Sequence, residues 1–153
     1  MKAVMLSIQP QWCSLIAKGK KSLDVRKSRP SLETPFKVYI YCTKAPGLDA
    51  VSGKVVGEFI CDKIERVGIP YPAYANSLDK RFIEQSVMSY WTLHGYAFHD
   101  DLFFWHISYL KLYDVPCDIK DFTALRKTRF GMMPVKVSRP PQSWIYVEER
   151  TAR

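Results

Sequence analysis

The residues best placed to do chemistry together lie in the cation-rich stretch of residues 19–30. If residues 22–26 form a strand, alternation places Asp24 and Arg26 on one face, with Lys21 at the strand entrance. Leu23 and Val25 then point into a core. A carboxylate beside two cations can form a neutralised ion pair that positions the cations for a phosphate or a base edge. It can also be a general base whose lysine neighbour stabilises developing negative charge.

The arginine favours the first of these two chemistries, because a neighbouring guanidinium weakens a carboxylate as a base. The predicted binding cations are Lys20, Lys21, Arg26, Lys27 and Arg29. If the protein is instead a hydrolase, Lys21 and Asp24 form the candidate catalytic pair, with Asp24 activating water. A solvated edge strand without a ligand is the alternative that these residues alone leave open.

Further groups suited to nucleobase recognition occur near the C-terminus. Gln142 and Ser143 offer an amide and a hydroxyl that can hydrogen-bond a base edge, and Trp144 follows them with a flat ring. Trp12 and Tyr41 are additional candidate stacking faces, although such rings more often belong to a core. We therefore include residues 142–144 in the predicted binding site.

The charge of the chain favours an anionic partner. The net charge is +8 and the pI is near 9.4, and residues 126–139 form a second basic segment, predicted to be a loop or hairpin. The 4 cysteines and 3 histidines lack metal-ligand spacing, so we expect neither a metal nor a cofactor. No apolar run approaches the roughly 20 residues of a membrane helix, and we expect a cytoplasmic protein without membrane contact.

The elements that must position these residues are short. Pro10 and Gly19 bracket a predicted helix that leads into the charged strand. Ser77, as an N-cap, predicts a helix over residues 78–91, and another short helix is expected over residues 119–125. The remaining strands are predicted at residues 4–8, 37–43, 54–64, 102–113 and 144–147. Together they predict one α+β domain over residues 1–153, built on a small, twisted, partly closed sheet.

Separate predictions can be made for three residues inside the predicted strands. Gly57 indicates a bulge or a close approach to the backbone. Glu58, in an otherwise apolar stretch, either faces water or requires a basic partner. His106 is more typical of a structural histidine than of a catalytic base.

The motif Gly19-x-Lys21-x-x-Asp24-x-Arg26 resembles the Gly-x-Lys-x-x-Glu-x-Arg signature of the ASCH domain, a member of the PUA-like superfamily. The resemblance extends over most of the chain, through residues 6–12, 39–43, 53–59, 105–110 and 139–144. It implies a PUA-like β-barrel with flanking helices and a cleft lined by the motif. It also implies RNA or a nucleoside-like molecule as the ligand.

The resemblance implies an enzymatic alternative as well. Some ASCH proteins resemble amidohydrolases that deacetylate acetylcytidine with a lysine, a threonine and a distant glutamate, and others are nucleases. The lysine corresponds to Lys21, but the threonine position falls on Asp24, so Ser22 is the only hydroxyl nearby. We therefore expect an RNA- or nucleotide-binding module. The alternative is a small hydrolase acting on a modified nucleoside or on RNA.

Overall fold

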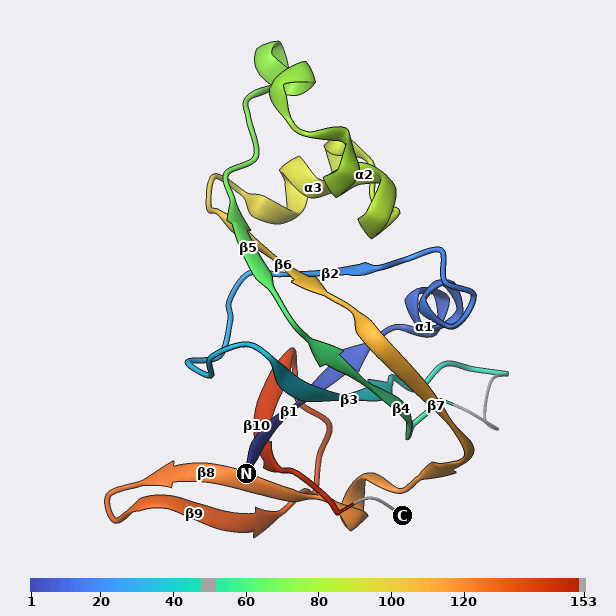
Figure 1. The fold of residues 1–153 in the computed structure, drawn as a ribbon, viewed down its shortest axis with the longest axis vertical. Helices are drawn as coiled ribbons and strands as arrows, with labels where there is room; N and C mark the ends of the chain where they lie inside the picture. Colours follow the sequence, from blue (N-terminus) through green and yellow to red (C-terminus); the bar gives the residue numbers. More distant parts are fainter. Residues whose placement is uncertain (48–51, 152–153) are drawn as a thin grey trace.

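The computed structural model describes residues 1–47 and 52–151, whose strands form two sheets (Figure 1). The larger sheet has the order β7-β4-β3-β1-β10-β8-β9, and the smaller has the order β2-β6-β5. The large-sheet strands are β1 (Lys2–Ile8), β3 (Phe36–Cys42), β4 (Lys54–Cys61), β7 (Ser108–Cys117), β8 (Thr123–Thr128), β9 (Gly131–Lys136) and β10 (Trp144–Glu148). The small-sheet strands are β2 (Leu23–Arg26), β5 (Ile64–Val67) and β6 (Leu102–His106). The helices are α1 (Pro10–Ala17), α2 (Lys80–Ser86) and α3 (Tyr90–Ala97), with short 3-10 turns η1 (Pro72–Ser77) and η2 (Ile119–Asp121).

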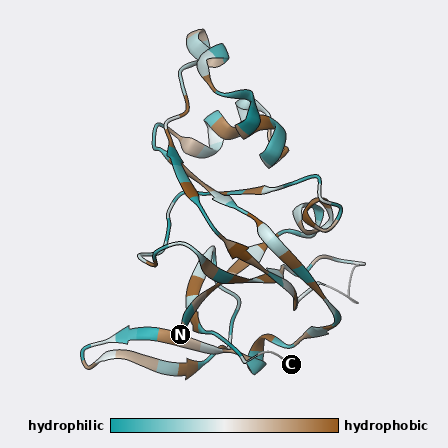
Figure 2. Cartoon of the chain, viewed as in Figure 1, coloured by the Kyte–Doolittle hydropathy of each residue, from teal (hydrophilic) through white to brown (hydrophobic). Residues whose placement is uncertain are grey.

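Strand β1 is the centre of the large sheet, with β3 parallel on one side and β10 antiparallel on the other. Its apolar sequence suits this place, because both of its faces are covered. Leu6 packs in one core with Phe59 and Trp105, whereas Met5 packs in another with Phe122. Figure 2 shows the corresponding concentration of apolar residues in the central strands.

A third core lies between the small sheet and the helices α2 and α3 (Figure 1). Leu23 and Val25 are buried there against Phe82, Leu93 and Phe104. The prediction that these two alternating residues of β2 point into a core is therefore confirmed. The same alternation sends Asp24 and Arg26 to the opposite side of the strand.

Two predicted strands are each divided between the two sheets. The strand expected over residues 54–64 ends at Cys61, and the chain continues in the small sheet as β5. The strand expected over residues 102–113 breaks at Ile107, between β6 of the small sheet and β7 of the large one. Strands β7 and β9 are opposite edges, so within the described part of the chain the sheet is not closed. The α+β class is correct, but the expected barrel is open.

Gly57 and Glu58 of β4 behave as their sequence context indicated. The register of β4 against β3 shifts next to Gly57, and a Cβ atom there would lie 2.6 Å from the Lys111 carbonyl oxygen. Glu58 has a basic partner, since the Lys37 Nζ atom lies 2.8 Å from its carboxylate, and it also accepts a hydrogen bond from Tyr113. This partner belongs to β3 and not to the motif.

The prediction of a single helix over residues 78–91 is wrong, because the chain forms the two helices α2 and α3 there. Val87 adopts a left-handed conformation with φ 57° and ends α2, and Ser89 then caps α3 by accepting a hydrogen bond from the Thr92 amide. Helix α2 is capped by Asp79 and not by Ser77. The helix expected over residues 119–125 shortens to η2, after which β8 begins. None of the described helices is long and apolar enough to span a membrane.

Residues 126–139 take the hairpin form of the two forms predicted for them. Strands β8 and β9 pair from Thr123↔Lys136 to Thr128↔Gly131, and Gly131 allows the turn with φ 101°. Strand β8 pairs with β10 only at Val147↔Ala124. The hairpin consequently extends away from the rest of the sheet (Figure 1).

Candidate functional site

The turn between α1 and β2 places the motif lysine. Gly19 has φ 74°, which ends the helix and reverses the chain. The Lys20 and Lys21 amides both donate to the Leu15 carbonyl oxygen, at 2.9 and 3.2 Å. Lys21 therefore sits directly before β2, as predicted, and its position is fixed by the backbone of the helix end.

Asp24 and Arg26 form a two-bond ion pair along β2. Arg26 Nε lies 2.6 Å from Asp24 Oδ2, and Arg26 Nη2 lies 3.2 Å from Oδ1. The guanidinium also donates to the Ser7 carbonyl oxygen at 2.9 Å and contacts Ser143 Oγ at 3.4 Å. Burial alone would lower the pKa of Arg26, but the charge of Asp24 outweighs it and raises that pKa. Both oxygens of Asp24 are thus occupied by its neighbour.

The face that carries this ion pair is not open, contrary to expectation. The side chains of Asp24 and Arg26 are only 5% and 12% exposed. The end of β1 at Ser7 and the chain segment at Ser143 cover them, and neither contact could be seen from the alternation of β2. The motif therefore forms a buried ion pair below the surface.

Lys21 is buried as well, with 3% of its surface exposed. Its ammonium donates to the Ser86 carbonyl oxygen and lies 4.7 Å from the centre of the Trp12 ring. Burial lowers the pKa of Lys21 to about 8, against the opposing effect of Asp24. The side chain therefore still carries its charge at pH 7, held between α1 and the end of α2.

The outer cations of the stretch reach the surface. Lys20, Lys27 and Arg29 are exposed, and Lys27 Nζ lies 5.3 Å from the centre of the Tyr96 ring. Tyr96 belongs to α3, and sequence reasoning missed it because nothing in its neighbourhood links it to the motif. Arg29 is partly engaged, since it donates to the Leu32 carbonyl oxygen.

The predicted binding residues near the C-terminus, residues 142–144, lie beside these exposed cations. Ser143 contacts Arg26, Gln142 is exposed, and Trp144 is half-buried with its Nε1 donating to Ser28 Oγ at 3.0 Å. Tyr41, the other predicted stacking face, is buried in the core. We call the surface formed by Lys20, Lys27, Arg29, Gln142 and Ser143, with Tyr96 and Trp144 at its borders, the motif patch.

The expected cleft around the motif does not appear among the well-formed surface hollows. None of five of the best-formed hollows in residues 1–47 and 52–151 is lined by Lys21, Asp24 or Arg26. A ligand at the motif patch would therefore rest on the surface above the ion pair.

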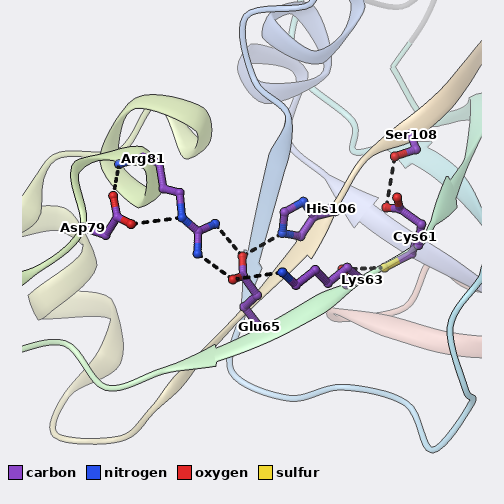
Figure 3. Close-up of polar contacts among 8 residues, drawn as sticks. Cys61, Lys63, Glu65, Asp79, Arg81, His106 and Ser108 are labelled. Atoms are coloured by element: carbon purple, nitrogen blue, oxygen red, sulfur yellow. Dashed lines mark hydrogen bonds and ion pairs between the residues drawn. The ribbon is translucent and has the colours of Figure 1, made fainter.

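A second cluster of charges surrounds Glu65 of β5 (Figure 3). Arg81 of α2 donates to both of its oxygens, at 2.6 and 2.7 Å, and His106 Nε2 lies 2.7 Å from one of them. Hydrogen bonds from Arg81, and then from His106, lower the pKa of Glu65 to about 2. The cluster ties α2 to the small sheet, and His106 has the structural contact expected of it. Glu65 is too well stabilised as an anion to act as a base.

The described part of the chain contains no group of three side chains that could hold a metal ion. All four cysteines are free thiols. Burial raises the pKa of Cys61 to about 12, and burial also raises the pKa of Cys13 and Cys42. These three thiols therefore stay protonated near pH 7 and are poor nucleophiles.

No family model and no curated protein matches the chain. Crystal structures of the ASCH protein of Zymomonas mobilis match its fold. A tyrosine-to-phenylalanine variant has a TM-score of 0.62 and 17% identity over 97% of this chain and 92% of that one. A serine-to-alanine variant gives 0.60 and 18% over 96% and 89%, and another crystal structure of the protein gives 0.59 and 18% over 96% and 88%. The expectation drawn from the motif is thus confirmed at the level of architecture, and the chain has the fold of these ASCH proteins.

Proposed function

We propose that this protein is a binding module for RNA or a nucleotide-like ligand, which it contacts at the motif patch. The proposed contacts are Lys20, Lys27, Arg29, Gln142, Ser143 and Trp144. Of the predicted binding residues, Lys21 and Arg26 lie buried beneath this surface and contribute their positive charge from below. The observation that carries the proposal is the ion pair of β2. Because Arg26 occupies both oxygens of Asp24, the carboxylate is neutralised, and the surface cations around it are left without a competing negative charge.

Phosphate recognition fits these surface groups. Lys20 and Lys27 are exposed, whereas Asp24 is buried and bonded to Arg26, so the two lysines can contact a phosphate with little repulsion from that carboxylate. Tyr96 lies under Lys27 and is itself 36% exposed, which offers a base a ring to stack on. Gln142 supplies an exposed amide for a base edge.

One observation favours the hydrolase as a second candidate. Lys21, with its pKa lowered to about 8, is suited to proton transfer near neutral pH. Its proposed partner is less suited, because Asp24 is buried and both of its oxygens already accept hydrogen bonds from Arg26. Binding therefore agrees better with the geometry than hydrolysis of acetylcytidine or RNA.

Binding is tested with a fluorescent tetrauridylate, titrated at two salt concentrations against three proteins. They are the wild type, the patch variant K20A/K27A/R29A and the control variant K54A/K80A, which removes two exposed lysines elsewhere. We expect the patch variant to bind roughly tenfold more weakly, and wild-type binding to fall with salt as counterions are released. Equal affinities of all three proteins, or binding indifferent to salt, would contradict the proposal.

A second experiment, with two other variants, tests the enzymatic alternative. Wild type, Lys21→Ala and Asp24→Asn are incubated with acetylcytidine and with a mixed RNA, and products are separated by chromatography. We expect no conversion above background. Wild-type conversion that disappears in both variants, while circular dichroism shows both to be folded, would make the protein an enzyme.

A further inference from the structure

A groove of about 690 Å3 lies between the β8–β9 hairpin and the β10 strand. It exists because β8 pairs with β10 at a single position, Val147↔Ala124, and then diverges from it. We call it the hairpin groove and define it by its lining residues on β8, β9, β10 and the segment before β10. Those that matter below are Leu125, Arg126, Lys127, Val135, Lys136, Arg139, Trp144 and Tyr146.

The charge of the hairpin groove is entirely positive. The sequence contains no aspartate or glutamate between Asp121 and Glu148, and four cations line the groove, namely Arg126, Lys127, Lys136 and Arg139. None of these four forms an ion pair with any residue in the described ranges. By contrast, the hollow lined by Lys37 and Lys111 also contains Glu58 and Asp114. The cations of the hairpin groove therefore have no carboxylate partner among the residues that the structure describes.

The remaining lining of the groove is apolar and aromatic. Leu125 and Val135 of the hairpin and Trp144 and Tyr146 of β10 all line it. Because Val135 pairs with Ala124 and Leu125 pairs with Pro134, Leu125 and Val135 belong to opposite faces of the hairpin. Cations that follow a backbone, combined with rings and apolar side chains under the bases, are the features by which proteins hold single-stranded nucleic acid. A duplex keeps its bases stacked inside and would leave these apolar groups without a partner.

The hairpin groove also adjoins the motif patch through one short segment. Pro140 and Pro141 line the groove, whereas Ser143 contacts Arg26. The Pro141 carbonyl oxygen accepts a hydrogen bond from Ser7 Oγ at 2.6 Å, which fixes this segment against β1. Trp144 borders both surfaces, since it lines the groove and donates to Ser28.

We propose that the hairpin groove is a second contact surface for single-stranded RNA, along which a strand held at the motif patch continues past Trp144 between β10 and the hairpin. The proposal rests on the proposed function for its choice of ligand, but it adds a separate set of residues. It predicts that affinity depends on RNA length, because only a longer strand reaches both surfaces.

The experiment compares fluorescent tetrauridylate and dodecauridylate on four full-length proteins. These are the wild type, the groove variant R126Q/K127Q/K136Q, the patch variant and the control variant defined above. Glutamine keeps the aliphatic stems, so the hairpin can still pair. We expect the wild type to bind the longer RNA at least tenfold more tightly than the shorter one. The groove variant should lose this advantage and keep its tetrauridylate affinity, with a salt slope reduced by about two for the longer RNA.

The outcomes separate the two proposals. If the groove variant keeps the length advantage, the groove proposal is overturned, and loss of tetrauridylate binding in the patch variant still supports the proposed function. If the patch variant binds tetrauridylate normally while the groove variant loses RNA affinity, the groove stands and the proposed motif patch fails. Absence of RNA binding by the wild type overturns both. Displacement of dodecauridylate by an equally charged glutamate peptide, with no effect of RNA length, would identify an acidic-peptide site and overturn the RNA assignment.

A charge-preserving variant distinguishes loss of positive charge from misfolding of the hairpin. Arg126→Lys keeps the positive charge in the groove, and we expect it to bind dodecauridylate within about twofold of the wild type. If Arg126→Lys loses as much affinity as the groove variant while urea unfolding shows both to be intact, the unpaired positive charge is not what binds the RNA, and the proposal is overturned.

Discussion

The small sheet β2-β6-β5, with helix α2 packed on it, and the β8–β9 hairpin both carry cations, but within residues 1–47 and 52–151 only those of the first region have carboxylate partners. Arg26 is paired with Asp24 on β2, and Arg81 is paired with Glu65 on β5. The hairpin contains no acidic residue at all. The small sheet is covered by α2 and α3, whereas every residue of β9 is exposed.

This difference separates two uses of positive charge. Burying a cation is costly unless a counter-charge or hydrogen bonds compensate it, so the pairs of the small sheet help fix the positions of strands and helices. An exposed cation remains hydrated and costs the fold little, so it stays available to an external anion. We therefore expect substitutions in the small sheet to change stability, and substitutions in the hairpin to change binding.

The largest effect is expected for Arg26→Ala. It leaves the buried Asp24 carboxylate without its partner, which typically costs about 3–5 kcal/mol. Arg126→Ala in the hairpin is the matched control, since it removes an exposed arginine without an ion pair, and we expect a change within about 0.5 kcal/mol. Urea unfolding of both variants measures the difference.

A double variant sharpens this test. D24A/R26A removes both charges, so no unpaired ion remains, and it should be less destabilised than Arg26→Ala alone. If Arg26→Ala and Arg126→Ala unfold at the same urea concentration, the contrast between the two regions is refuted.

The next largest effect is a loss of folding stability in acid, as Glu65 becomes protonated. Its pKa is about 2 in the folded protein against an ordinary 4.5, because Arg81 and His106 donate to it. A carboxyl group with a lowered folded pKa stabilises the fold above its unfolded pKa, and this contribution disappears as the pH falls from about 4.5 to 2. We expect a loss of about 2–3 kcal/mol over that interval.

Glu65→Gln should remove most of this acid dependence, because an amide does not titrate. Glu84→Gln is the matched control, as Glu84 lies exposed on the same helix as Arg81. Thermal unfolding between pH 2 and 6 makes the comparison. An acid profile of Glu65→Gln that equals that of wild type would show that the cluster does not stabilise the small sheet.

The smallest effect is the change in folding stability with pH that Lys21 causes in the alkaline range. Its folded pKa of about 8 lies below the ordinary 10.5, so the unfolded chain binds the proton first as the pH falls. Wild-type stability should therefore decrease from pH 10 to pH 8 relative to Lys21→Met, by about 1–2 kcal/mol. Lys20→Met, at the exposed neighbouring lysine, should show no such trend. Equal pH profiles for the two variants would mean that burial does not perturb Lys21.

Local sequence patterns predicted the elements whose signals are complete within a few residues. The alternation of Leu23 and Val25 identified the buried face of β2, and Gly19 identified the end of α1. The helix prediction over residues 78–91 failed because it overlooked a second local signal. Ser89 is a helix N-cap three residues before the Thr92 amide that it binds, and it marks the start of a new helix.

Sheet membership could not be predicted in the same way. The alternating pattern runs on without interruption through Cys61 and Ile64, and again through His106 and Ser108, although the chain changes sheets at both places. A strand looks the same in sequence whichever neighbour it pairs with. The open form of the large sheet is likewise decided by pairing between strands that are far apart in the chain.

By itself, the sequence determined the ASCH-like motif, the inward face of β2 and a hairpin segment with cations and no acids. Only the tertiary structure decided what surrounds the motif. Ser7, Ser86 and Ser143 come from distant parts of the chain, yet they supply the contacts that bury Arg26 and Lys21. Burial and pairing depend on these long-range contacts, and no spacing within residues 19–30 encodes them. The hairpin cations stay unpaired for the opposite reason, because no distant carboxylate of the described chain packs against them.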